Sequence, residues 1–374
     1  MDTKRLNPKS YSETDDYESF YHPLLPYLRN IIHQPMKKLS CALILIFFSI
    51  LASAQVQKIE PLTKGTKTSI RGLSVVTDNV VWASGSNGMV GTSINGGKDW
   101  RWFQVKGFEK TDFRDIEAFD GATAIIMAVD TPAYILRTTD GGYNWKVVYE
   151  NKKPGMFLDA MEFWNSEAGI VIGDPINGKI FIARTFDGGQ SWTELPEQFK
   201  PAAEKGEACF AASGTNIRAL DRDEAVFITG GTSSNIFIRD QKIKLPIVQG
   251  KETTGANSVA VCDNKKINGG NKMIVVGGDF NADSSALNNC FYTTNRGKSW
   301  KAPKQPPHGY RSCVEYLTEK NLITCGTSGV DYSTDGGETW NLLTKEGYHV
   351  VRKAKDGNTV YLAGGGGRIA KLVE

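Results

Sequence analysis

The chain has 374 residues, of which 40% are hydrophobic, 23% charged and 10% aromatic, a composition that indicates a globular protein and excludes a disordered, collagenous or coiled-coil chain. With 44 basic and 41 acidic side chains the formal charge is only +3, so the chain has no excess positive field for nucleic acid. The 39 glycines predict many tight turns, and the four histidines are too few for a histidine-rich metal site.

The first predicted element is a secretory signal peptide at residues 36–54. It begins with a Met and two lysines, continues through an apolar run at 41–51 and ends in Ala-Ser-Ala, so cleavage is expected after Ala54. The run is shorter than the roughly 20 residues of a transmembrane helix. We therefore expect an exported, periplasmic or extracellular protein without a transmembrane span. Residues 1–35 are interpreted as a mis-assigned start or a disordered extension.

Five segments then repeat one pattern, [ST]-x-[DN]-x-G-x-x-W, and five of the eight tryptophans end such a segment. The pattern is typical of a β-hairpin turn in which the Asp or Asn side chain accepts backbone hydrogen bonds, the second Gly takes a positive φ and the Trp covers the turn. We interpret these residues as structural and not catalytic, because five equivalent copies around a fold do not converge on one point. They are Asn95, Asp140, Asp187, Asn295 and Asp335, with Trp100, Trp145, Trp192, Trp300 and Trp340.

A second pattern is a short apolar strand that ends in small residues, and it occurs seven times. The copies lie at residues 80–85, 124–130, 169–174, 226–231, 273–279, 322–327 and 360–365. Seven short strands at this spacing, most followed by a hairpin, predict an all-β, seven-bladed β-propeller of four-stranded antiparallel blades over residues 55–374. One blade, at 225–242, lacks the tryptophan turn. The last blade lacks a fourth strand, which residues 56–62 are expected to supply, so that the ring closes without an open edge.

The tryptophan turns resemble the BNR/Asp-box propellers, a family that includes sialidases, sortilin-like receptors and photosystem II assembly and stability factors. The pattern is most similar to the last branch, in which an inner strand bears an Arg, as at Arg71 and Arg311, before a Gly-ended second strand and the Asp-box turn. The resemblance implies at most a role in assisting or recognising other exported or envelope proteins, and the leading hypothesis is a non-enzymatic propeller that binds such a partner. The sialidase opening is absent, since the phrase at residues 69–72 lacks its proline.

Candidate functional residues are expected on the face opposite the Asp-box turns, called the loop face here. The loops between second and third strands meet the blade-to-blade crossings there, and both long insertions, 196–216 and 279–289, belong to it. The candidates for binding are Arg71, Arg114, Arg311, Asp174, Asp279, Tyr310 and His349, with His349 placed at the position of Arg311.

Three interpretations of these residues remain open. The acids and arginines could pair with each other to line a channel, or the arginines could bind a protein or envelope partner, since a guanidinium matches a carboxylate. The third is a glycoside hydrolase acting on a glycan. It would use two carboxylates about 5–5.5 Å or 6.5–9.5 Å apart. The catalytic candidates are Asp130, Asp174, Glu207 and Asp279.

No metal and no cofactor are expected from the sequence. The segment 279–290 resembles a calcium loop but has Ser284 in place of the glycine and Cys290 in place of the bidentate glutamate. Five cysteines at irregular spacing match no zinc pattern and are interpreted as buried apolar residues; one bridge, for example Cys313 with Cys325, would be compatible with an oxidising compartment. They are Cys209, Cys262, Cys290, Cys313 and Cys325.

Overall fold

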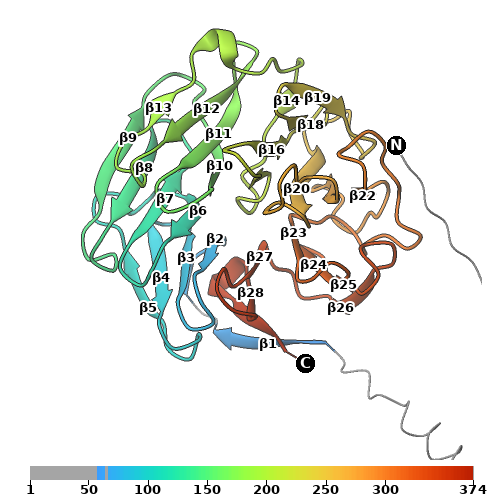
Figure 1. The fold of residues 1–374 in the computed structure, drawn as a ribbon. Helices are drawn as coiled ribbons and strands as arrows, with labels where there is room; N and C mark the ends of the chain where they lie inside the picture. Colours follow the sequence, from blue (N-terminus) through green and yellow to red (C-terminus); the bar gives the residue numbers. More distant parts are fainter. Residues whose placement is uncertain (1–56, 64–65, 374) are drawn as a thin grey trace, which may run out of the picture. The chain divides into compact units, whose positions relative to one another are not determined.

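The computed structural model describes residues 57–63 and 66–373, which form seven antiparallel β-sheets placed radially around one axis (Figure 1). This confirms the predicted all-β, seven-bladed propeller. The predicted extension at 1–35 and the signal peptide at 36–54 lie outside the described residues. Among the described residues no helix is long and apolar enough to cross a membrane.

The first three blades have four strands each, numbered outward from the axis. Blade 1 contains β2 (Ile70–Val75), β3 (Val81–Gly85), β4 (Met89–Ser93) and β5 (Arg101–Gln104). Blade 2 contains β6 (Phe113–Ala118), β7 (Ala124–Ala128), β8 (Ala133–Thr138) and β9 (Lys146–Asn151). Blade 3 contains β10 (Leu158–Phe163), β11 (Gly169–Ile176), β12 (Lys179–Thr185) and β13 (Thr193–Glu194), followed by the short 3-10 helix η1 (Glu197–Phe199).

Blades 4 and 5 depart from this regular form. Blade 4 contains β15 (Ile217–Ala219), β16 (Ala225–Ile228), β18 (Asn235–Ile238) and β19 (Gln241–Lys244). Blade 5 contains β20 (Thr254–Val261), β21 (Met273–Asp279) and β22 (Cys290–Thr293), extended on its inner side by β17 (Gly230–Gly231) and β14 (Glu207–Ala208). Its outer edge is a single bridge between Tyr292 and Lys301.

The last two blades lead back to the start of the ring. Blade 6 contains β23 (Cys313–Tyr316), β24 (Leu322–Gly326), β25 (Gly329–Ser333) and β26 (Asn341–Thr344). Blade 7 contains β27 (Val350–Lys353), β28 (Val360–Ala363) and β29 (Ile369–Val373), with the short η2 (Gly365–Gly367). The N-terminal β1 (Lys58–Thr63) pairs antiparallel with β29 and completes blade 7, as the sequence predicts. First and last strands thus share one sheet (Figure 1).

The five Asp-box turns share one set of hydrogen bonds. In each, the Ser or Thr hydroxyl donates to the Asp or Asn side chain at 2.8 to 3.1 Å and accepts from the second Gly N–H at 2.9 to 3.1 Å. The Asp or Asn oxygen accepts from the amide four residues later. Both central residues, and not only the predicted second Gly, have positive φ, which explains the Gly-Gly pair. In the fourth copy Arg296 takes this conformation.

The core lies between the blades, where the facing sheets pack their apolar side chains. Every pair of neighbouring blades shares a buried cluster, and the one spanning blades 6, 7 and 1 joins the end of the chain to its beginning. The Asp-box turns contribute to this packing: Gly97 of blade 1 lies against Leu62 and Tyr361 of blade 7, and Gly337 of blade 6 against Ile274 of blade 5. The repeated turns therefore join neighbouring blades.

Blade 4 lacks the Asp-box turn, as predicted for residues 225–242. Its outer hairpin is a two-residue turn of Arg239 and Asp240, because Ile238 pairs directly with Gln241. Arg239 has a φ of 57°, the left-handed conformation that such tight hairpins require.

Candidate functional site

The two faces of the propeller are defined by hydrogen bonds between loops. On the Asp-box face, the first central residue of each turn donates to a carbonyl in the loop between the first and second strands of its own blade. On the loop face, the loop between second and third strands meets the crossing to the next blade, as in Gly88 N–H to Thr111 O. This is the arrangement that the sequence analysis assumed.

Near the axis, the loop face is built from equivalent inner-strand residues. Arg71, Arg114, Asp159 and Asn257 are each the extra residue of a β-bulge between the first and second strands of blades 1, 2, 3 and 5. A bulge redirects a side chain out of the regular ladder and is frequent next to functional sites. Asp159 was missed in the sequence analysis, although it follows Arg114 by one blade repeat.

The register corrects the assignment of Arg311. Cys313 pairs with Cys325 as Gly72 pairs with Ser84, so the residue equivalent to Arg71 is Ser312. Val350 pairs with Ala363 in the same way, which places His349, and not Arg311, at the Arg71 position. Arg311 precedes this equivalent position by one residue, and its side chain lies in the interior.

The buried Arg311 is held by a complete set of partners. Its side chain and that of Asp331 on β25 are both fully buried and form a salt bridge, with Arg311 Nε 2.7 Å from Asp331 Oδ2. Arg311 Nη1 also donates to Tyr310 O at 2.8 Å and to Ser328 Oγ at 2.9 Å. Arg311 therefore has no surface for a ligand, and its role in this structure is to join β23 to β25.

Arg71 and Arg114 form a cationic group on the loop face, and the imidazole of His349 lies beside Arg71. Arg114 pairs with Asp112 at 2.8 Å and its guanidinium lies 5.9 Å from the centre of the Phe157 ring. The charge of Arg71 has no carboxylate within 4 Å among residues 57–63 and 66–373, and its one hydrogen bond goes to a backbone carbonyl. Burial and the nearby Arg71 lower the pKa of His349 to about 4, so this imidazole is neutral at pH 7.

An aromatic group lies close to these cations. The Tyr310 hydroxyl donates to Asn257 Oδ1 at 2.8 Å, and its side chain is almost completely buried. The ring of Phe280 packs edge-on against Tyr310 and against Phe210, with centroids 6.3 and 6.0 Å apart. Phe280 is 43% exposed, so the loop face offers apolar surface beside its arginines.

The first long insertion does not form an open loop as expected. Its end, residues 209–216, enters the central channel as a plug whose Ser213, Thr215 and Asn216 are completely buried. The plug makes hydrogen bonds to blades 1, 5, 6 and 7. These are Arg71 Nη1 to Ala212 O (3.2 Å), Thr215 Oγ1 to Ser258 Oγ (2.7 Å), Ser213 Oγ to Ser312 O (2.7 Å) and Arg352 Nη2 to Ser213 O (3.0 Å).

The four carboxylates proposed for catalysis have different surroundings. Asp130 is exposed, and Asp279 is held by the Thr253 hydroxyl at 2.8 Å and the Asn281 amide. Glu207 is buried and bound by Lys242 Nζ at 2.7 Å and by Asn235 and Thr229. Two of the four are thus committed to structural hydrogen bonds, which fits the pairing interpretation and gives no support to a glycosidase.

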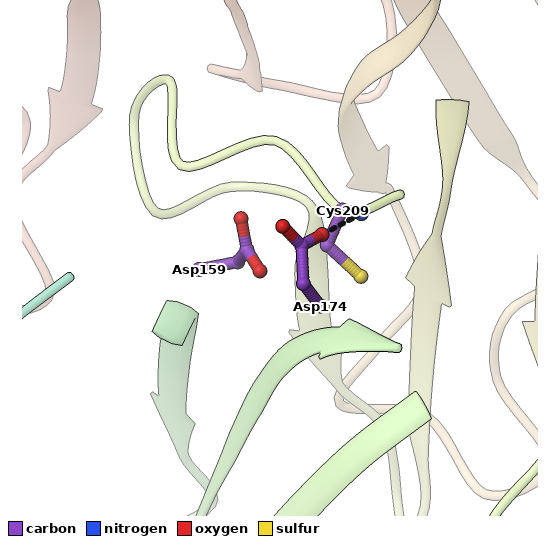
Figure 2. A group of neighbouring side chains, drawn as sticks. All are labelled: Asp159, Asp174 and Cys209. Carbon is purple, nitrogen blue, oxygen red and sulfur yellow. Dashed lines mark hydrogen bonds between the residues drawn. The ribbon is translucent and has the colours of Figure 1, made fainter. Parts of the chain in front are cut away.

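Asp174 instead meets two residues that the sequence analysis did not assign to the site. Asp159, Asp174 and Cys209 each direct an oxygen or sulfur atom into one group in which these atoms lie within 4.8 Å of one another (Figure 2). Cys209 N–H donates to Asp174 Oδ1 at 2.8 Å. Burial raises the pKa of Asp174 to about 6 and that of Asp159 well above its usual range.

A cavity of about 1330 Å³ lies on the Asp-box face, where no site was expected. Its charges pair internally: Arg218 Nη2 lies 3.2 Å from Glu315 and Arg218 Nη1 lies 3.8 Å from Glu162, and Lys355 pairs with Glu117.

The remaining sequence hypotheses concern calcium and disulfides. The described residues contain no group of acidic side chains at 279–290 that could hold a metal. The five cysteines from Cys209 to Cys325 are all free, although Cys313 and Cys325 are direct partners on β23 and β24.

Comparisons with known proteins agree with this architecture. A family model for the BNR/Asp-box repeat matches residues 331–342, which include the whole blade 6 turn. The chain is thus a seven-bladed β-propeller that carries a BNR/Asp-box repeat in blade 6. Its fold is similar to that of YCF48 bound to a D1 peptide (TM-score 0.60, 16% identity, 86% of this chain and 96% of the other). No match is found among curated proteins.

The propeller fold is shared with other solved structures. YCF48 from Cyanidioschyzon merolae matches with a TM-score of 0.60 and 15% identity over 84% of this chain and 98% of its own. The WD40 propeller domain of Doa1 matches with a TM-score of 0.57 and 11% identity over 86% and 98%. At these identities the likeness describes the fold, and function has to be argued from the site.

Proposed function

We propose that this BNR/Asp-box propeller is a non-enzymatic binding protein that holds a carboxylate-bearing protein segment on its loop face. The observation that carries the proposal is Arg71, a half-buried guanidinium close to the axis with no carboxylate partner within 4 Å among the described residues. A guanidinium in this position can donate two parallel hydrogen bonds to a carboxylate.

The electrostatics around Arg71 favour an anionic ligand. Burial and the neighbouring Arg114 both lower the pKa of Arg71, which means that its positive charge is poorly compensated. Asp112 offsets part of this charge but already pairs with Arg114. A ligand carboxylate would supply the missing partner.

The surroundings favour a peptide over a small anion. The exposed Phe280 ring and the half-buried Phe157 offer apolar contacts beside the arginines, as a segment with both side chains and a charge would need. YCF48, a propeller of the same fold, has been solved with a D1 peptide bound. This supports a protein segment as the class of ligand.

The proposal is tested with an array of short peptides that carry either a free or an amidated C-terminus and either acidic or amide side chains. Wild-type protein should retain a subset of carboxylate-bearing peptides. Arg71→Gln with Arg114→Gln should weaken this binding by roughly tenfold or more, since arginines are frequent hot spots.

Arg222→Gln is the matched control, because Arg222 is an exposed arginine on the other face. It should bind as wild type does, and thermal melts should show that all variants are folded. Equal binding by the double variant, or no carboxylate-dependent binding by wild type, would reject the proposed function.

We further propose that the propeller acts after export, on a protein or another component of the cell envelope. The support is the sequence at residues 36–54, with its two lysines, apolar run and small-residue cleavage site. N-terminal sequencing of the protein recovered from the exported fraction should give Gln55 as the first residue. Recovery of uncleaved protein from the cytoplasm alone would contradict export.

A further inference from the structure

Asp159, Asp174 and Cys209 come from three different parts of the chain. Asp159 is the bulge residue of β10, Asp174 lies on the neighbouring β11, and Cys209 directly follows β14 at the start of the plug. Figure 2 shows the two carboxylates facing each other, with the Cys209 side chain beside Asp174. One ligand atom from each residue lies within 4.8 Å of the other two.

Asp159 provides an independent reason to expect a ligand here. The residue is completely buried, and neither carboxylate oxygen has a hydrogen-bond partner of normal geometry, although Arg114 and the nearby N–H groups of Ala211 and Asp174 favour its charge. Buried polar groups in proteins are nearly always satisfied, because an unpaired one costs free energy. An unpaired carboxyl that faces a second carboxylate calls for a cation.

We propose that Asp159, Asp174 and Cys209 form a binding site for a divalent transition-metal ion of the Zn²⁺ type. A thiolate ligand favours Zn²⁺ and similar ions over Mg²⁺ or Ca²⁺, which take oxygen ligands. Three protein ligands would leave a fourth tetrahedral position for water or a ligand atom. The irregular spacing of the three residues explains why no sequence pattern for zinc reveals the site.

The local structure is already arranged for an ion. The Cys209 N–H holds Asp174 Oδ1 at 2.8 Å, which fixes this carboxylate and leaves its other oxygen available. The ladder between β10 and β11 fixes the spacing of the two aspartates. Asp159 and Cys209 are buried whereas Asp174 is partly exposed, so an ion would enter past Asp174.

The charges of the surroundings also fit a dication. Two carboxylates and a thiolate carry more negative charge than one divalent ion neutralises, and Arg114 is the nearby cation that favours the ionised form of Asp159. Burial raises the pKa of all three groups, that of Asp174 to about 6. Binding must therefore release protons, and the affinity should increase as the pH rises through 6.

Titration of the full chain with Co²⁺ tests the proposal, with a non-thiol reductant present. Wild type should develop the intense near-ultraviolet charge-transfer absorption of a thiolate–cobalt bond at one equivalent, and Zn²⁺ should displace it. Cys209→Ser should lose this absorption. Cys290→Ser is the matched control, because Cys290 is equally buried on β22 outside the group, and it should keep the absorption.

Asp159→Asn supplies a second measurement in case the cysteine variant does not fold. This change keeps the shape of the side chain and removes its charge, so the variant should fold and bind Zn²⁺ at least 100-fold more weakly by calorimetry. Three results would overturn the proposal: no thiolate–cobalt absorption in wild type, equal absorption in Cys209→Ser, or unchanged Zn²⁺ affinity in Asp159→Asn. The peptide array tests Arg71 and Arg114 and not the three proposed metal ligands. The peptide-binding proposal and the metal-site proposal can therefore fail independently.

Discussion

The two faces of the propeller use the same blades in opposite ways. On the Asp-box face, five turns repeat one set of hydrogen bonds within about 0.3 Å and fasten each blade to its neighbour. On the loop face, the inner-strand position equivalent to Arg71 holds a different residue in almost every blade: Arg71, Arg114, Asp159, Asn257, Ser312 and His349.

The difference shows which residues of a repeat fold stabilise it and which can determine what it binds. A residue that recurs in every blade stabilises the ring, because each copy faces an equivalent neighbour. A residue that varies at an equivalent position has no such general role, and around a common axis the six variable positions face one another. An equivalent position whose residue differs between blades is therefore a better indication of a functional site than one whose residue is the same in every blade.

The largest loss of stability is expected for a substitution of Arg311. The sequence places Arg311 with Arg114 on the loop face, whereas the structure buries Arg311 in the interior. Arg311→Ala leaves the fully buried Asp331 without its guanidinium, which costs about 3–5 kcal/mol for a buried pair. Arg114→Ala removes a side chain that is 31% exposed and should change stability by less than about 0.5 kcal/mol. Urea unfolding of both variants measures the difference, and equal destabilisation would contradict the register argument.

The next largest loss of stability is expected for a substitution in the plug, a loop-face segment with a structural role. Gly214 has a φ of 66°, and a Cβ there would lie 2.3 Å from Asp115 Oδ1, so Gly214→Ala should cost about 2–4 kcal/mol through strain and overpacking. Gly107→Ala is the matched control: its φ is 84° but nothing lies within 4 Å of the added methyl group. Similar unfolding free energies for both variants would show that the plug is loosely packed.

A smaller effect is expected on the Asp-box face itself. Asp140→Ala removes the acceptor for Asn144 N–H at 3.0 Å and the Thr138 hydroxyl at 2.8 Å in an exposed turn, so the loss should be about 1 kcal/mol. Asp240→Ala, in the blade 4 hairpin that lacks the Asp box, is expected to stay within about 0.5 kcal/mol. If the two changes cost the same, the turn motif would not be the stabilising element.

These contrasts also show what the sequence could predict. The tryptophan turns and small-residue strands were sufficient for the blade number, the blade without a motif at 225–242 and the closing strand, because each depends on local hydrogen bonds and apolar spacing. The same locality explains why both central turn residues, including Arg296, share one conformation.

The site was harder to predict because it depends on register and on long-range packing. Matching the two arginines by residue type placed Arg311 at the axis, but Arg311 lies 15 residues before Gly326 whereas Arg71 lies 14 before Gly85, and the register places Ser312 there. The insertion at 196–216 reads as a polar loop, yet its end is buried by contacts with four other blades that no local pattern encodes. Asp159 could have been found by aligning the inner strands at the blade repeat.

The smallest expected effect is a pH dependence that originates on the loop face alone. The pKa of His349 is lowered to about 4 by burial and by Arg71, against about 6.5 in the unfolded chain. Between these values the unfolded state binds more protons, so His349 contributes stability above pH 6.5 that is lost as the pH falls toward 4. From pH 7 to pH 6 this loss should be about 0.7 kcal/mol.

His349→Gln should remove this part of the pH dependence of the free energy of unfolding. The difference between wild type and variant therefore gives the contribution of His349 without that of Asp174. The pKa of Asp174 is raised to about 6, so the stability that it contributes has the opposite sign and is lost as the pH rises through 6. Identical slopes for the two proteins between pH 7 and 6 would mean that burial and Arg71 do not hold His349 neutral. A carboxylate bound at Arg71 would raise the pKa of His349, so saturating peptide should flatten the wild-type slope and leave the variant unchanged.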